Sequence, residues 1–167
     1  MGLSLYDRVK DELRTGDLVQ WGAHDLLGAI IQGVTHSDVS HSSLVIRLTE
    51  YEGLERRRFT TEALRHGVVL NLLSRRLEHH TGRAWWYPLK DEWNDKRQLI
   101  GERALSFVGI PYDFKSVAKF LFTRVSADAR AIFCSELCYL AWNFVGPAPA
   151  PVDMPKLGIF KDPVKIL

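Results

Sequence analysis

Cysteine is scarce in this sequence, which has two, Cys134 and Cys138, among 167 residues. Two cysteines four positions apart on one helix lie at the limit of disulfide geometry, so we do not expect a fold held together by disulfides. Reduced thiols are typical of a reducing compartment. A zinc site built from both cysteines and His41 is a disfavoured alternative, because this cysteine spacing is not a usual one for zinc ligands.

The sequence also lacks a long apolar run and a surplus of charge of one sign. Its longest apolar stretch, residues 26–34, is too short to cross a bilayer, and the charged N-terminus has no apolar core of signal-peptide length. The 22 basic and 20 acidic residues nearly balance, which gives no reason to expect a nucleic-acid partner. We therefore expect a cytoplasmic protein without a transmembrane segment, whose arginine clusters at 56–58 and 75–76 are solvated surface.

The length and the 46% hydrophobic content are those of a single globular domain, spanning residues 1–167. Alternating patterns predict a block of strands with antiparallel neighbours at 17–21, 41–48, 57–64, 68–73 and 85–88. Helical patterns are found from a Ser4 cap to Leu13 and at 24–34, 75–80, 91–108 and 115–125, whereas the proline-rich residues 146–155 are expected to be extended. Helices that flank a contiguous block of strands indicate the α+β class.

Cys134 stands at the head of an apolar run whose spacing of three and four residues predicts a buried helix. This pattern puts its sulfur in the first helical turn, where free N–H groups and the helix dipole favour a thiolate. Such a cysteine becomes a nucleophile when a base lies beside it. The alternative is that Cys134 simply packs, as many buried cysteines do, and Cys138 is expected to pack in this way.

Six histidines compete to be that base, and His41 is the best placed of them. It heads an apolar strand, so a sheet packed against the Cys134 helix can hold its ring within hydrogen-bond reach of the sulfur. Glu62, on the strand that we pair with this one, is the candidate for orienting the imidazole. Two alternatives stay open: Thr60, on the same strand face, for the orienting role, and a solvated surface position for Glu62.

Five short motifs follow one another along the chain, namely GDLV from Gly16, THSDVSHSSLVI from Thr35, TEALRHGVVL from Thr61, GIPYDF from Gly109 and FCSELCYLAW from Phe133. In this order they resemble the permuted NlpC-type papain-like cysteine amidohydrolases. The group in question is the YiiX/YaeF group, which is related to lecithin–retinol acyltransferase. The resemblance runs from Gly16 to about Trp142, most of the chain.

The resemblance implies a circularly permuted papain-like fold, in which an antiparallel sheet packs against helices and the nucleophile lies at a helix N-terminus. It makes Cys134 the nucleophile, His41 the base and Glu62 the third polar residue. Tyr112 falls on a substrate-binding tyrosine that lines the site or helps to hold an oxyanion. The backbone N–H of Cys134 would be the other oxyanion donor.

These expectations describe a thiol hydrolase that cleaves a peptide-like or amino-acyl amide through a thioester, with no metal or cofactor. The expected partner is a small or peptide-like amide substrate, lipid-linked in one variant. Two alternatives stay open: lipid ester hydrolysis or acyl transfer at the same site, and a non-catalytic module that binds a small acyl or amine ligand.

Overall fold

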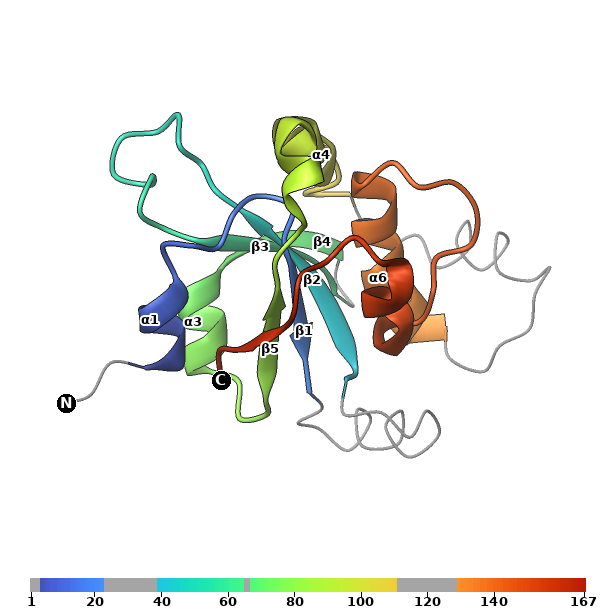
Figure 1. The fold of residues 1–167 in the computed structure, drawn as a ribbon, viewed down its shortest axis with the longest axis horizontal. Coiled ribbons are helices and arrows are strands. Elements are labelled where there is room, and N and C mark those ends of the chain that lie inside the picture. The colour runs from blue at the N-terminus through green and yellow to red at the C-terminus, as the bar shows by residue number, and fades with distance from the viewer. Residues whose placement is uncertain (1–3, 23–38, 65–66, 111–128) are drawn as a thin grey trace.

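The structure, a computed structural model, describes residues 4–22, 39–64, 67–110 and 129–167, with side chains in the last range from residue 134 onward. Its elements, in chain order, are α1 (Leu5–Val9), β1 (Leu18–Trp21), β2 (His41–Ile46), β3 (Phe59–Leu64), β4 (Gly67–Leu72), α3 (Leu73–Glu78), β5 (Ala84–Tyr87), η1 (Asp91–Lys96), α4 (Arg97–Ser106), α6 (Ala129–Ala141), η2 (Pro151–Leu157) and β6 (Val164–Lys165). This is an α+β arrangement (Figure 1).

The described strands form one six-stranded sheet in the order β4-β3-β2-β1-β5-β6, and all neighbouring pairs are antiparallel. β1 and β2 lie in the middle, where nearly all of their residues are buried. The register sets Trp21 of β1 opposite His41 of β2, and Val45 of β2 opposite Thr60 of β3. Side chains that are directly opposite in this way share a face of the sheet.

Each face of the sheet is covered by its own helices, with α1 and α3 on one side and α6 on the other (Figure 1). The first core cluster includes Leu44, Ile46, Ile100, Cys138 and Ala141. The second core cluster includes Tyr6, Val19, Val45, Leu73 and Leu77. Because successive residues of β2 belong to different clusters, this one strand supports both helical layers.

Asp17, directly before β1, ties that strand to β5 and α4. Its buried carboxylate accepts hydrogen bonds from Trp86 Nε1 at 2.9 Å and from the backbone N–H of Leu89 at 3.0 Å, and it lies 2.7 Å from Arg97 Nη1. The preceding Gly16 has a φ of +92°, and a Cβ there would lie 3.0 Å from Leu89 Cδ1. The Gly-Asp motif therefore builds the scaffold, because both residues are needed for this close junction.

The five predicted strands are confirmed, each within two residues of its expected ends, and so is the Ser4 cap of α1, although α1 ends at Val9 and does not continue to Leu13. The predicted helix over 91–108 is divided, because its first turns are the 3-10 helix η1 and only Arg97–Ser106 is α-helical. The segment expected to be extended includes the start of η2, which has proline at its first position. β6 was not expected, and the helices predicted at 24–34 and 115–125 lie outside the described residues.

The expectation that both arginine clusters are solvated is wrong for Arg58, whose side chain is 2% exposed. Its guanidinium donates hydrogen bonds to the backbone carbonyls of Leu13 at 3.0 Å and Asp11 at 3.2 Å. These acceptors allow an arginine to be buried, since burial of a charged group is tolerated where its donors are bonded. Arg76, in the other cluster, forms an ion pair with Glu62 and belongs to the site described next.

Candidate active site

The antiparallel neighbours β2 and β3 bring His41 and Glu62 together, as the sequence predicts. His41 opens β2 and Glu62 lies inside β3, and the His41 Nε2 atom is 2.9 Å from Glu62 Oε2. The His41 side chain is 17% exposed, whereas that of Glu62 is fully buried. The solvated alternative for Glu62 is therefore wrong, and its carboxylate contacts the imidazole directly.

Both oxygens of the Glu62 carboxylate are fully occupied. Oε1 accepts hydrogen bonds from Thr60 Oγ1 and Asn71 Nδ2, each at 3.0 Å. Oε2 accepts from Arg76 Nε at 3.2 Å in addition to meeting His41. Four donors around one buried carboxylate stabilise its charged form, because each bond would be lost or weakened on protonation.

The electrostatics of Glu62 follow from these contacts. Burial alone would raise the pKa of its carboxyl, but the hydrogen bond and charge of His41, the Arg76 guanidinium and the Asn71 amide lower the pKa to about 2. Glu62 is therefore an anion throughout the ordinary pH range. Thr60, the alternative candidate for orienting the histidine, donates to Glu62 and so supports the residue that touches the ring.

Cys134, on α6, is the other partner of the His41 ring. Burial opposes a charge on the His41 ring, but the negative charge and hydrogen bond of Cys134, together with those of Glu62, raise the pKa of His41 to about 10. Because Nε2 faces Glu62, Nδ1 is the nitrogen left to exchange a proton with the sulfur. The site can therefore hold a thiolate beside an imidazolium whose second nitrogen is bound to a carboxylate.

The position of Cys134 within its helix differs from the expectation. α6 begins at Ala129, so Cys134 is its sixth residue and lies in the second turn, not at the N-terminus. At this depth the backbone N–H bonds to the carbonyl four residues back, so it is not a free oxyanion donor, and the dipole effect fades within the first turn. The apolar pattern in the sequence starts at Cys134, whereas the helix itself also includes the five residues before Cys134. The group that can act on the sulfur is therefore His41 and not the helix end.

Cys138, one turn further along α6, packs as expected. Its side chain is fully buried in the cluster that joins α6 to the sheet. Burial, and after it the charge of Cys134, raises the pKa of the Cys138 thiol well above its ordinary value. Cys134 is also buried, with 1% of its surface exposed, so the two cysteines differ not in burial but in their neighbours: among the residues described, only Cys134 has an imidazole beside it.

Three residues around the Cys134–His41–Glu62 group were not expected from the sequence, namely Trp21, Asn71 and Arg76. Trp21 lies opposite His41 in the sheet, and the guanidinium carbon of Arg76 lies 4.7 Å from the centroid of the Trp21 ring. Asn71 reaches Glu62 from β4, the next strand of the sheet. Period-two alternation from Glu62 and its partners would have put Asn71 on this face, but nothing in the sequence marks Arg76 apart from Arg75. Tyr112, the predicted substrate-binding residue, lies outside the described residues.

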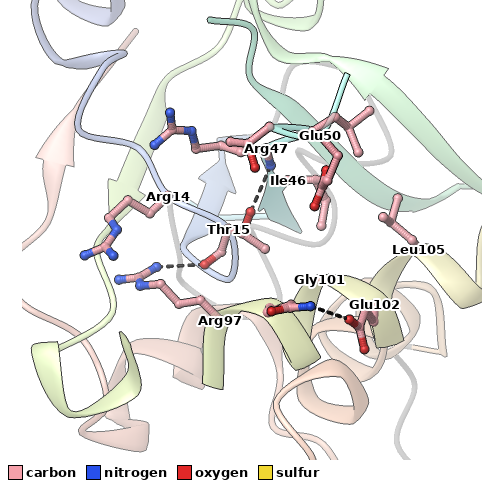
Figure 2. Close-up of a pocket in the computed structure, with 12 residues that line it drawn as sticks. Arg14, Thr15, Ile46, Arg47, Glu50, Arg97, Gly101, Glu102 and Leu105 are labelled. Atoms are coloured by element: carbon pink, nitrogen blue, oxygen red, sulfur yellow. Dashed lines mark hydrogen bonds between the residues drawn. The ribbon is translucent and has the colours of Figure 1, made fainter. Parts of the chain in front are cut away.

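A cavity of about 340 Å³ lies between the end of β2 and α4, and it is lined by Arg14, Thr15, Ile46, Arg47, Leu48, Thr49, Glu50, Arg97, Gln98, Gly101, Glu102 and Leu105 (Figure 2). None of the Cys134–His41–Glu62 group lines it. His41 stands at the opposite end of β2, about 16 Å away along a strand that rises about 3.3 Å per residue. This cavity is therefore separate from the candidate active site.

The fold is similar to that of a solved structure, the metalloprotein yiiX from Escherichia coli O157:H7, of the group designated DUF1105. The TM-score is 0.56 and the identity 22%, over 78% of this chain and 64% of the yiiX chain. The resemblance seen in the sequence motifs is thereby confirmed at the level of the fold. The chain spans less than two thirds of the matched yiiX chain, and no family model and no curated protein matches it. Within the described ranges, no helix has the length and apolar character needed to cross a bilayer.

Proposed function

We propose that the chain is a thiol hydrolase that cleaves an amide bond, peptide-like or amino-acyl, through a thioester on Cys134. The observation that supports this most directly is that the His41 imidazole bonds both to Cys134 and to the buried carboxylate of Glu62. It supplies a nucleophile, a base and an orienting anion, the three roles that covalent acyl transfer requires.

In the proposed reaction, the Cys134 thiolate attacks the carbonyl carbon, and the His41 imidazolium gives its proton to the leaving nitrogen as the C–N bond breaks. An acyl thioester and a neutral His41 remain. His41 then takes a proton from a water molecule whose oxygen attacks the thioester, which releases the acid and returns the thiolate–imidazolium pair. Glu62 keeps the ring in one orientation during both proton transfers. If an alcohol or amine replaces the water, the same steps give acyl transfer, and a lipid ester is the nearest alternative substrate.

A metal ion does not fit this group of residues, although yiiX is described as a metalloprotein. Each oxygen of Glu62 already accepts two hydrogen bonds, and one of the donors to Oε2 is the cation Arg76. Within the part of the chain that the structure describes, no three His, Cys, Asp or Glu side chains are arranged to hold a metal ion. The proposal therefore derives no step through a metal.

The test is labelling with an electrophilic amide mimic, followed by mass mapping of the modified peptide. We expect the label on Cys134, and we expect His41→Ala to lower the labelling rate at neutral pH roughly 100-fold or more, because the base that generates the thiolate is lost. His79→Ala, at an exposed position at the end of α3, is the matched control and should label like the wild type. Equal rates for the two alanine variants, or a label on Cys138, would overturn the proposal.

A further inference from the structure

We infer that Arg76 is a positioning residue of this site: held against the face of Trp21, its guanidinium fixes the Glu62 carboxylate in the orientation that His41 needs. The inference rests on the proposed thiol chemistry and adds to it a residue that lies beyond the Cys134–His41–Glu62 group.

The first argument is geometric. Arg76 Nε donates to Glu62 Oε2 at 3.2 Å. The same oxygen lies 2.9 Å from His41 Nε2. Thr60 and Asn71 hold only the other oxygen. Without Arg76, the oxygen that faces the imidazole would keep His41 as its single partner, and the carboxylate would be held firmly only at Oε1. Arg76 therefore acts on the atom that contacts the base.

The second argument is that Arg76 is itself held in place. Its guanidinium lies 4.7 Å from the centroid of the Trp21 ring, within the range of a cation–π contact. Trp21 is 1% exposed, and its Nε1 donates to Ser43 Oγ at 2.9 Å. Trp21 also lies opposite His41 in the sheet, so the indole that holds Arg76 belongs to the residue paired with the base.

The third argument concerns charge during the reaction. In the resting pair, the imidazolium of His41 balances Glu62, but His41 becomes neutral once it has protonated the leaving group. A buried carboxylate that loses its only cation is strongly destabilised. Arg76 stays charged at every step, because a guanidinium does not lose its proton in proteins. With a side chain 28% exposed, it is partly shielded from solvent, so its charge still reaches Glu62 when His41 is neutral.

The groups that face Glu62 come from four elements: His41 of β2, Thr60 of β3, Asn71 of β4 and Arg76 of α3. Among them, Arg76 is the permanent cation. Removing it raises the pKa of Glu62, since the arginine charge is one of the causes that lower it. Glu62 would then take a proton at a higher pH, and the imidazolium of His41 would lose its counter-ion there.

The experiment is the pH profile of Cys134 alkylation by iodoacetamide, recorded with thermal melting for Arg76→Gln, Arg76→Lys and the control Arg75→Gln. Arg75 is adjacent on the same helix, but its side chain is 68% exposed and pairs with Glu78 at the surface. For Arg76→Gln we expect a plateau rate lower by about tenfold and an acid limb about one pH unit higher than in the wild type. Arg76→Lys keeps the charge without the Nε bond, so its acid limb should stay near that of the wild type while its plateau falls. Arg75→Gln should follow the wild type in both.

The outcomes separate this inference from the proposed function. If wild-type Cys134 reacts no faster than Cys138, the proposed function is wrong and the inference falls with it. If wild-type Cys134 is reactive and a folded Arg76→Gln keeps both the plateau and the acid limb, the inference alone is overturned. Should Arg76→Gln fail to fold, the plateau of Arg76→Lys decides, because an unchanged rate there contradicts a role for the Nε hydrogen bond.

Discussion

Glu62 is a carboxylate in the interior of the protein, a place where an uncompensated charge would be very costly. Four donors bond to it, and three of them, His41, Arg76 and Asn71, lower its pKa to about 2 from an ordinary value of 4.5. Such a group ties stability to pH. Its contribution is complete above the ordinary pKa, where the unfolded chain also ionises, and it is lost as the pH falls toward the folded pKa.

We predict that this contribution is measurable in Glu62→Gln, which does not titrate. Between about pH 6 and about pH 3, the unfolding free energy of the wild type should fall by about 2 kcal/mol more than that of the variant. The measurement is urea unfolding at both pH values. Glu78→Gln is the control, because its ion pair with Arg75 lies in solvent and is screened. Parallel pH dependence in wild type and Glu62→Gln would mean that Glu62 is not held as an anion.

Single site residues can be predicted from the sequence where a local pattern points to them. Cys134 heads an apolar run, His41 heads a strand, and Glu62 lies on the neighbouring strand, so their types and places can be read from the chain. Arg76 could not be found in this way. It differs from Arg75 only in which side of a short helix it occupies, and that side is decided by the packing of Leu73 and Leu77 on the sheet.

Among the elements, the junction of β1, β5 and α4 lies at the opposite end of β1 from the candidate active site. Asp17 and Arg97 form a nearly buried ion pair at 2.7 Å, with exposed fractions of 1% and 9% for their side chains. Arg97 also donates to the backbone carbonyl of Thr15 at 2.7 Å. The pair lies at the start of β1, whereas His41 is opposite Trp21 at the end of that strand.

We predict that Asp17→Asn destabilises the fold by about 3 kcal/mol, because it leaves a buried guanidinium without its anion and sets an amide N–H₂ among donors. The rate of Cys134 alkylation, normalised to the folded fraction, should stay near that of the wild type. Denaturant unfolding and labelling on the same samples give both values. Asp95→Asn, on the exposed side of η1, serves as the control. A loss of thiol reactivity in a folded Asp17→Asn would show that the junction and the site are coupled.

Element ends were harder to predict than element types, for physical reasons. α6 starts five residues before Cys134, whereas the apolar periodicity that predicts the helix begins only at Cys134. The break between η1 and α4 falls inside a continuous helical pattern, since the two helix types differ by a small change in hydrogen-bond spacing. β6 has two residues, too few for any alternation to show.

In the whole molecule, the α+β class follows from the order of strand and helix patterns, and the structure confirms it. The antiparallel pairing of β3 with β4 follows from a connection of two residues, whereas β2 and β3 are joined by twelve. The position of β5 beside β1, and of β6 at the sheet edge, depends on contacts between distant parts of the chain that no local pattern encodes. The same long-range packing carries α6 across the face of the sheet and sets Cys134 beside His41.

Because α6 is bound to the sheet through a shared core, Cys138 should report on the unfolding of the whole molecule. It is fully buried with Leu44, Ile100 and Trp142, which come from three different elements or their ends. In a Cys134→Ser background, we predict that Cys138 is labelled only through global unfolding. Its labelling rate should then rise with urea, with the same slope as the equilibrium unfolding free energy, and the free energy derived from labelling should match that from denaturation.

The companion variant, Cys138→Ser, retains Cys134 and should be labelled in the native state at a rate that hardly changes with urea below the transition. A labelling rate of Cys138 that is equally independent of urea would mean that α6 opens locally, apart from the sheet. The geometry of the site would then fluctuate with that helix. Agreement of the two free energies would instead mean that the contact between Cys134 and His41 is as stable as the fold itself, since the core that holds Cys138 also holds the helix that carries Cys134.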